Sequence, residues 1–226
     1  GSKELTALNY YTNEEITIPL DPTQTPGENA QRYFAKYNKQ KRTFEALTEL
    51  IQETADDIQY LESISNALDI ALNEADLAQI KEELMQSGYI RRKHTKKKVK
   101  LTSKPMHYIS SDGYDMYVGK NNLQNEELTF SFANGNDWWF HAKGAPGSHV
   151  IVKSGGDELP DQTFEEAGRL AAYYSKNRGA DKVEIDYIQK KHVKKPNGAK
   201  PGFVVYYTNY SLVIDSDISN IKNVQD

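Results

Sequence analysis

The stretch DWWFHAKGAPGSHVIVK, residues 137–153, decides how the second half of this chain folds. An aromatic run, a loop containing Gly and Pro, and a β-branched run follow one another, which is typical of two strands joined by a loop. Along the first strand Trp138 and Phe140 share one face, while Trp139 and His141 share the other. We therefore expect one of these pairs in the core, with the other pair lining something else.

Similar runs lie on both sides of this stretch. Alternating apolar residues around Asp112-Gly113 predict a hairpin. Further strands are expected at residues 128–132, 148–153, 183–188, 203–208 and 211–215, and an amphipathic helix at 165–177. Strands followed by one helix and more strands predict an α+β domain with a largely antiparallel sheet.

The first part of the chain has a different pattern. Residues 8–18 predict a short strand or hairpin. Thr25-Pro26-Gly27-Glu28 has the form of a capping box, so a helix should begin near Pro26. No Gly or Pro then occurs until Gly88. This interval predicts one long helix, or two nearly continuous helices with a second start at residues 73–76.

Apolar residues recur along this helix at three- and four-residue steps, the spacing of a coiled-coil seam. The seam consists of Phe34, Tyr37, Phe44, Ile51, Ala55, Ile58, Leu61, Leu68 and Leu72. A single apolar stripe requires a partner, and we find no second helix of similar length in the sequence. The partner is therefore either an upstream segment or a second copy of the molecule, which leaves self-association through the arm open.

These patterns divide the chain into four parts. We expect a short strand and turn segment at 1–25, a coiled-coil helical arm at 26–90, a basic linker at 91–104 and a compact domain at 105–226. Residues 1–90 hold 16 acidic and 7 basic residues, a net charge of −9, whereas residues 91–226 hold 16 acidic and 21 basic residues, a net charge of +5. This asymmetry indicates that the second part meets a polyanion.

Composition excludes several classes. With 38% apolar and 27% charged residues and no apolar stretch of roughly 18 residues, a membrane protein is not expected. Cysteine is absent, which excludes disulfides and thiolate metal sites and favours a cytoplasmic location. No signal segment follows Gly1-Ser2, although the cell surface, reached without a signal peptide, is the alternative.

The first candidate RNA-binding group is amide-rich. Lys120, Asn121, Asn122 and Gln124 lie within five residues of one another. Amide side chains donate and accept hydrogen bonds, which suits base edges and the 2′-hydroxyl, and a neighbouring lysine suits a phosphate. Asn also favours turns for purely conformational reasons, which is the alternative for any single one.

The second group is a loop with glycines, where His141, Lys143, Ser148 and His149 would form a cationic phosphate site with free backbone N–H groups. We expect the first two groups to form one surface. Zinc would need further ligands at motif spacing, so no metal is predicted. A Ser148/His149 nucleophile pair is disfavoured because adjacent strand residues point to opposite faces. We expect no cofactor and no catalytic residues, so the chain is not predicted to be an enzyme.

The third group is QKKHVKKPNGAKPG, residues 189–202, which has five lysines and no acid. A solvated loop is the alternative, but the excess positive charge of the domain favours polyphosphate binding. Its candidate contacts are Lys190, Lys191, Lys194, Lys195 and Lys200. Possible secondary RNA contacts are Arg32, Lys36 and Lys39 near the start of the arm, and Arg91, Arg92 and Lys96 in the linker.

The chain resembles the NFACT family of RqcH/NEMF-type ribosome quality-control factors. GYDMYVGKNNLQNEELTF, DWWFHAKGAPGSHVIV and VKKPNGAKPGFVVYY resemble the NFACT-R domain, and the arm resembles the second half of the coiled-coil middle region. Lys120 stands where the family pattern leads us to expect Arg, and Asn125-Glu126 where Asn-Asp is usual.

The resemblance implies binding to a large ribosomal subunit (rRNA) that carries peptidyl-tRNA, with recruitment of alanyl-tRNA for C-terminal alanine tailing. Bacterial members are also labelled fibronectin-binding proteins. A surface adhesin that binds fibronectin through a strand edge or the acidic arm is therefore the alternative function, and one protein could have both roles.

Overall fold

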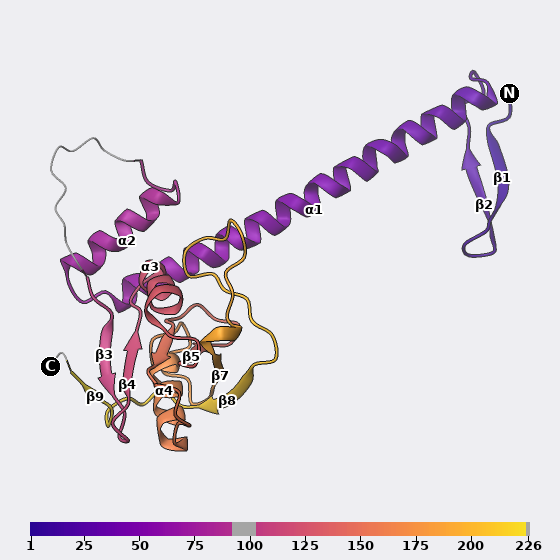
Figure 1. Ribbon diagram of the computed structural model, residues 1–226. Helices are drawn as coiled ribbons and strands as arrows, with labels where there is room; N and C mark the ends of the chain where they lie inside the picture. The colour runs from indigo at the N-terminus through magenta and orange to yellow at the C-terminus, as the bar shows by residue number, and fades with distance from the viewer. Residues whose placement is uncertain (92–102, 225–226) are drawn as a thin grey trace. The chain divides into compact units, whose positions relative to one another are not determined.

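The computed structural model describes residues 1–91 and 103–224, and the chain divides into two compact units, residues 1–57 and 58–226 (Figure 1). Helix α1 (Pro26–Ile70) contributes to both units. Most of the predicted basic linker, including Arg92 and Lys96, lies outside the described residues. No helix within the described ranges is long and apolar enough to cross a membrane.

Unit 1 begins with the predicted hairpin. Strands β1 (Glu4–Asn9) and β2 (Glu14–Pro19) pair antiparallel, and Asn13 has a φ of 57° at the turn. A two-stranded hairpin alone is marginally stable in water. Here the buried Asn29 of α1 ties its end to the helix, because the Asn29 side chain accepts from the Asp21 N–H at 2.8 Å and donates to the Asp21 carbonyl at 3.0 Å.

The capping box that was predicted at the start of α1 is present. Glu28 accepts a hydrogen bond from the Thr25 N–H at 2.7 Å, and the Glu28 N–H donates to Thr25 Oγ1 at 3.3 Å. These reciprocal bonds satisfy backbone donors that the first helical turn leaves free. They also hold the pKa of the Glu28 carboxyl below its usual value.

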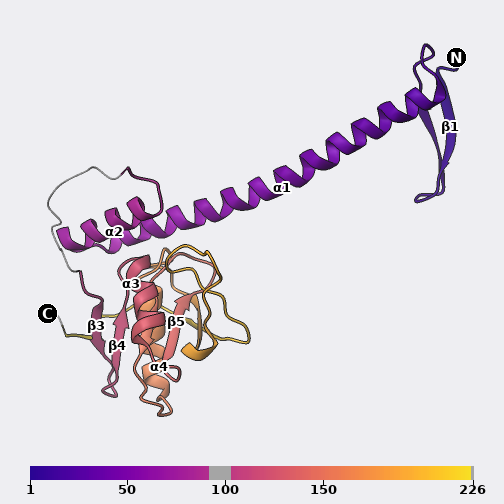
Figure 2. The same cartoon turned by 45° about the horizontal axis from the view of Figure 1, so that its top comes forward.

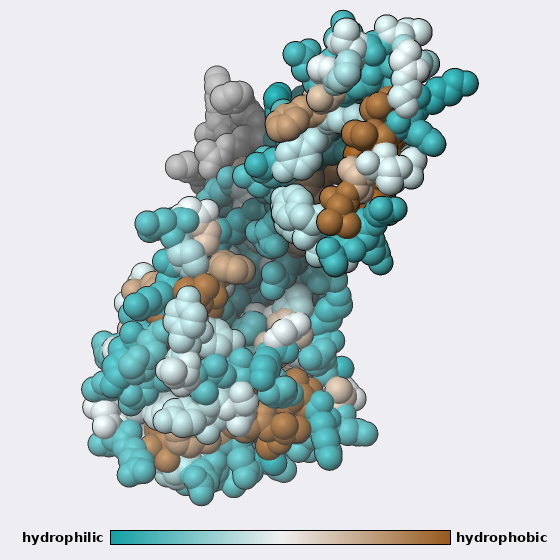
Figure 3. Space-filling view, turned by 90° about the vertical axis from the view of Figure 1, so that its right-hand side faces the viewer, coloured by the Kyte–Doolittle hydropathy of each residue, from teal (hydrophilic) through white to brown (hydrophobic). Residues whose placement is uncertain are grey.

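The apolar seam of α1 is exposed in unit 1. Phe34, Phe44 and Ile51 are each at least 68% exposed, and leucines of β1 are exposed as well. Figure 3 shows apolar side chains gathered on the surface of this unit. No described residue covers the seam, so its pairing with an upstream segment or a second copy remains a prediction.

Unit 2 is built around a seven-stranded antiparallel sheet in the order β8-β7-β5-β6-β4-β3-β9. The strands are β3 (Met106–Ile109), β4 (Asp115–Val118), β5 (Trp138–Ala142), β6 (Val150–Val152), β7 (Val183–Gln189), β8 (Tyr210–Ile214) and β9 (Lys222–Asn223). The hairpin around Asp112-Gly113 is confirmed as β3–β4, with Gly113 at a φ of 89° that favours glycine. The α+β prediction is correct.

Both faces of this sheet are covered. Helix α4 (Asp161–Tyr173) packs on one face, where Phe140, Val152 and Leu170 belong to the main core (Figure 1). On the other face a second core contains Trp139, Ile151 and Ile188. The expectation that only one pair of the DWWFHA strand lies in the core is therefore wrong, because the sheet has two packed faces.

Helix α3 (Asn122–Glu127) continues into a π-helical turn, η1 (Leu128–Phe132). The second face is covered by Leu128 and Phe130 of η1 together with Val193, Val204 and Tyr206. The predicted strand at 128–132 is wrong. The alternation of LTFSF fits a strand, but a helix starts upstream because the Asn121 side chain caps it by accepting from the Gln124 N–H at 3.0 Å. Leu128 and Thr129 are buried and Phe132 is exposed.

The predicted strand at 203–208 is also absent from the sheet. Strand β7 already pairs with β5 on one side and with β8 on the other, so neither of its edges is free. Residues 203–208 instead make a single bridge, Lys194 to Val205, and Thr208 has a φ of 59°. A short 3-10 turn, η2 (Lys190–His192), precedes this segment.

The end of α1 and helix α2 (Glu74–Gln86) pack together in unit 2 (Figure 2). Their shared core includes Tyr60, Ile64 and Ile80. The predicted second start is confirmed, since the Asn73 side chain accepts from the Asp76 N–H at 3.1 Å. The two helices thus form a support on which the amide-rich residues lie.

Candidate nucleic-acid interface

The amide segment, residues 120–125, is buried. Lys120, Asn121, Asn122 and Gln124 are each at most 7% exposed. Asn121 caps α3, and the Gln124 side chain accepts from the Lys120 N–H at 3.0 Å. The expectation that these side chains form an exposed surface is wrong, because they meet partners on α1 and α2.

Lys120 forms a buried ion pair with Asp76 of α2. Lys120 Nζ lies 2.7 Å from Asp76 Oδ1, and Ser103 Oγ donates to the same oxygen. Burial acts to raise the pKa of Asp76, but the hydrogen bonds from Lys120 and Ser103 hold the pKa below its usual value. Lys120 thus pairs with a carboxylate within the fold, and its contact with an RNA phosphate stays a prediction.

Asn122 and Gln124 complete the contact with the helices. Asn122 Nδ2 donates to Glu83 Oε1 at 2.8 Å and to Ser63 Oγ at 2.7 Å, and Gln124 Nε2 donates to Gln79 Oε1 at 2.7 Å. Burial raises the pKa of Glu83, although the bond from Asn122 opposes this. Amides suit this position because they satisfy donors and acceptors that an apolar residue would leave unpaired.

The glycine loop, residues 143–149, also departs from the expectation. Ser148 and His149 are buried, and His141 is half-buried. Burial lowers the pKa of His141 to about 4 and that of His149 well below its usual value. These lowered pKa values disfavour the charged imidazole that a cationic phosphate site requires. His149 Nδ1 instead lies 2.8 Å from Thr129 Oγ1.

The amide segment and the glycine loop do lie together, as the sequence suggested. The His149 N–H donates to Asn125 Oδ1 at 2.9 Å, and Asn125 Nδ2 donates to the Gly147 carbonyl at 3.3 Å. Their contact is internal packing. Of the predicted loop residues Lys143 is exposed, and it pairs with Glu184 at 2.5 Å. Their RNA contacts stay a prediction, and the burial of Ser148 and His149 favours a structural role for these two.

Of the three main candidate groups, the basic segment, residues 189–202, is the one in which several lysines are exposed. Lys191 and Lys194 are exposed and form no ion pair among the described residues. Lys195 pairs with Glu126 at 2.6 Å. Lys190 Nζ lies 5.9 Å from the centroid of the Phe130 ring.

Lys200 joins the basic segment to the helical support. Its Nζ donates to Tyr89 Oη at 2.9 Å and lies 4.5 Å from the centroid of the Tyr60 ring. An ammonium group over aromatic rings is held by a cation–π interaction. Lys200 therefore anchors the segment within unit 2.

The secondary basic residues fall in different places. Arg32, Lys36 and Lys39 are exposed on α1 in unit 1, with Arg32 3.8 Å from Asp21. Arg91 is exposed at the last described residue before the gap. Nothing in this arrangement tests their predicted RNA contacts.

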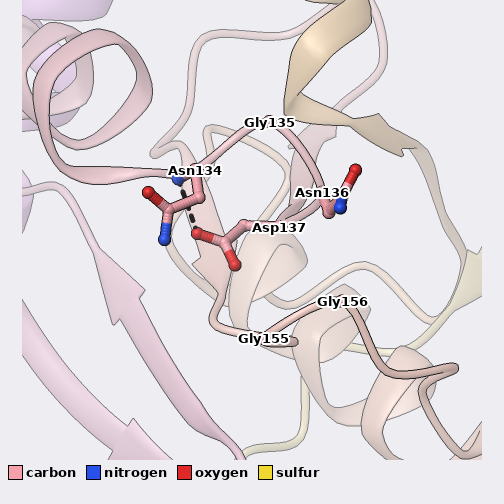
Figure 4. Close-up of a pocket in the computed structure, with 6 residues that line it drawn as sticks. All are labelled: Asn134, Gly135, Asn136, Asp137, Gly155 and Gly156. Carbon is pink, nitrogen blue, oxygen red and sulfur yellow. Dashed lines mark hydrogen bonds between the residues drawn. The ribbon is translucent and has the colours of Figure 1, made fainter.

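A cavity next to the basic segment was not predicted. The turn Asn134–Asp137 and the glycines Gly155 and Gly156 enclose about 190 Å³ (Figure 4). The backbone N–H of Lys191 donates to the Gly135 carbonyl at 2.9 Å, so the basic segment begins at the cavity rim. The sequence predicts the two turns, because the run Asn-Gly-Asn-Asp and the pair Gly-Gly are typical of turns. It does not predict that these two turns meet.

Comparisons with known proteins agree with this architecture. Residues 1–103 match the model of the NFACT N-terminal and middle domains, and residues 104–208 match the model of the NFACT protein RNA binding domain. The chain belongs to the NFACT family. The matched NFACT RNA binding domain ends before β8 and β9, which complete the sheet.

Curated relatives bear the name Rqc2 homolog RqcH. The chain is 46% identical over 218 residues to the relative from Streptococcus pneumoniae and 41% identical over 228 residues to that from Bacillus subtilis. These matches cover 96% and 98% of this NFACT chain and 39% of each relative, so the chain spans about two fifths of their length.

A solved structure is similar as well. It is described as the C-terminal of the fibronectin/fibrinogen-binding protein from Streptococcus suis. The two chains are 43% identical with a TM-score of 0.79, over 88% of this NFACT chain and 79% of the other. Because identity and fold agree over most of both chains, the family assignment extends across the arm and the sheet domain.

Proposed function

We propose that this chain binds RNA of the large ribosomal subunit in ribosome quality control, and that the basic segment carries the binding. Support comes from the match to the NFACT protein RNA binding domain and from relatives named Rqc2 homolog RqcH. The proposal assigns binding, and no catalytic step, to this chain. Action on the ribosome would place it in the cytoplasm.

The observation that carries the proposal is which lysines of unit 2 form ion pairs and which are exposed without one. Lys143, Lys153 and Lys176 are paired with carboxylates. Lys191 and Lys194 are exposed and unpaired within the described residues, so they lose no internal partner when they meet a phosphate. Neutralising phosphates releases counterions and makes binding strongly salt-dependent.

The test measures binding of the 226-residue chain to purified large ribosomal subunits over a salt series. Changing Lys191 and Lys194 to Ala should weaken binding and reduce the slope of log affinity against log salt by about 1.4–1.8, for two lost phosphate contacts. The matched control changes Lys182 and Lys222, which are also exposed, to Ala. Equal slopes in both double variants would contradict the proposal.

A finer proposal concerns tRNA. As a member of this family, the chain would help to recruit alanyl-tRNA to a subunit with stalled peptidyl-tRNA, so that alanines are added to the stalled chain. The parts of the relatives that lie outside this two-fifths match would contribute as well. Binding of alanyl-tRNA to subunits with and without the chain tests this; no difference would reject it for this chain.

The adhesin remains the alternative. The similar Streptococcus suis structure is described as part of a fibronectin/fibrinogen-binding protein. Immobilised fibronectin therefore belongs in the same salt series. Tight, salt-insensitive binding to fibronectin together with no subunit binding would favour the adhesin.

A further inference from the structure

The cavity at residues 134–137 and 155–156 is small, and one carboxylate joins its two loops. Its 190 Å³ lies below the roughly 300–1,000 Å³ of pockets for drug-sized ligands, so it has room only for a small chemical group. The buried Asp137 carboxylate holds the two loops together, because it accepts from the Asn134 N–H at 2.7 Å and the Ser154 N–H at 3.2 Å and pairs with Lys153. Its oxygens are thus already used.

The remaining lining groups are open to a ligand. Asn134 and Asn136 are exposed, and their side-chain amides form no hydrogen bond with any described residue. Gly155 and Gly156 adopt φ values of 65° and 100°, and without side chains they leave the loop backbone accessible (Figure 4). Free amides beside an accessible backbone offer both donors and acceptors.

A row of aromatic rings begins at Phe132, close in sequence to the cavity turn. Phe132 is 42% exposed and precedes the cavity turn by two residues. Lys153 connects the two features, since its Nζ lies 4.8 Å from the Phe132 ring centroid and pairs with Asp137. Tyr117 meets Phe132 edge-on at 4.7 Å between ring centroids, and His107 stacks on Tyr117 at 4.5 Å.

The basic segment, which follows β7, contacts the turn that lines the same cavity. The Lys190 N–H donates to the Asp137 carbonyl at 2.8 Å, and the Lys191 Cβ lies 3.7 Å from where a Cβ on Gly135 would stand. The Phe132 ring, the free amides and the Lys190 and Lys191 cations thus belong to residues that line or neighbour the turn at 134–137. These are the three groups that contact the base, the base edge and the phosphate of a nucleotide.

We propose that this surface binds one unpaired RNA nucleotide, with the base stacked on Phe132, its edge at Asn134 and Asn136, and its phosphate at Lys191. An unpaired base is required, because bases within a duplex do not offer their faces to an aromatic side chain. The inference rests on the proposed RNA binding and deepens it. Such a site would bind single-stranded or loop RNA more tightly than duplex RNA.

The experiment compares a ten-nucleotide single-stranded RNA that carries a central 2-aminopurine with a blunt duplex of the same sequence. The 226-residue chain should bind the single strand more tightly and quench the 2-aminopurine fluorescence by stacking. Phe132→Ala should lower single-strand affinity by about 5- to 150-fold, the range for one lost base stack, and abolish the quenching. Duplex affinity should stay unchanged.

A second variant changes Asn134 and Asn136 to Ala together. It should likewise lower the affinity for the single strand and leave the affinity for the duplex unchanged. Matched controls are Phe34→Ala, an exposed phenylalanine of unit 1, and Asn220→Ala, an exposed asparagine. Thermal unfolding of every variant checks that the fold is intact.

Two outcomes would overturn the inference. If both RNAs bind equally and neither the Phe132 nor the Asn134/Asn136 variant changes affinity, the cavity is only a turn, while the proposed RNA binding stands. If the unaltered chain binds neither RNA nor the large subunit, the proposed function fails and the inference fails with it.

Discussion

The amide segment (120–125) and the basic segment (189–202) are both dense in polar side chains, yet unit 2 buries the first and exposes much of the second. The amide segment meets Asp76, Gln79 and Glu83 of α2, which supply partners for its donors. Lys191 and Lys194 have no carboxylate partner within the described ranges. Polar density alone therefore does not predict which side chains are exposed; that depends on whether the fold supplies internal partners.

The strongest test of this comparison breaks the buried ion pair. Asp76→Ala leaves the Lys120 ammonium buried without its carboxylate, so we expect the free energy of unfolding to fall by about 3–5 kcal/mol. Urea unfolding followed by circular dichroism measures this loss. The double change of Asp76 to Leu and Lys120 to Met removes both charges and should recover much of it; a wild-type midpoint for Asp76→Ala would show that the pair is solvated.

The second test uses pH and the buried imidazoles. The folded-state pKa of His141 is depressed to about 4 from 6.5, so its contribution to stability is complete above pH 6.5 and is lost as pH falls towards 4. The loss should be about 3 kcal/mol over this interval for His141 alone. Thermal unfolding between pH 7 and pH 4.5 measures it, and His141→Gln should flatten the dependence. An unchanged pH profile in that variant would mean that other groups control the transition.

The third test separates structure from recognition in the amide segment. Asn122→Ala removes the donor to Glu83 and Ser63 and leaves a buried carboxylate under-satisfied, so unfolding free energy should fall by about 1–3 kcal/mol. RNA affinity of the folded variant should not change. The opposite pattern, full stability with weakened RNA binding, would restore the recognition role that the sequence suggested.

The smallest effect on stability is expected in the basic segment. Lys191→Ala or Lys194→Ala should change the free energy of unfolding by no more than about 0.5 kcal/mol, because both side chains are exposed and unpaired within the described residues. Each should reduce the salt slope of RNA binding by about 0.7–0.9. Chemical denaturation paired with RNA titration gives both numbers, and a stability loss above 1 kcal/mol would place these lysines in an unrecognised internal contact.

The lesson for the arm is similar. Its helical seam follows from spacing alone, and the structure leaves Phe44 and Ile51 exposed. Sedimentation of the chain, with Phe44→Gln and Ile51→Gln together as a comparison, distinguishes self-association from a monomer. Periodicity identifies a surface that requires a partner, but it does not identify the partner.

Local chemistry allowed several features to be predicted from the sequence. The Thr25–Glu28 capping box, the Asn73 cap and the Asp112-Gly113 hairpin depend on hydrogen bonds or backbone preferences within a few residues. The α+β class could also be predicted, because it follows from the succession of strands, one helix and further strands along the chain. Such features require no knowledge of distant parts of the chain.

Features that depend on distant contacts could be decided only by the tertiary structure. Trp139 is buried because η1 and the segment at 193–206 cover a face that alternation alone would leave open. Residues 203–208 have strand-like composition but form no strand in the sheet, since β5 and β8 occupy both edges of β7. The amide segment is buried because α2 places Asp76 and Glu83 beside it, and the cavity exists because two turns separated by about 20 residues meet. Burial and pairing are properties of the folded neighbourhood, and residue type alone does not encode them.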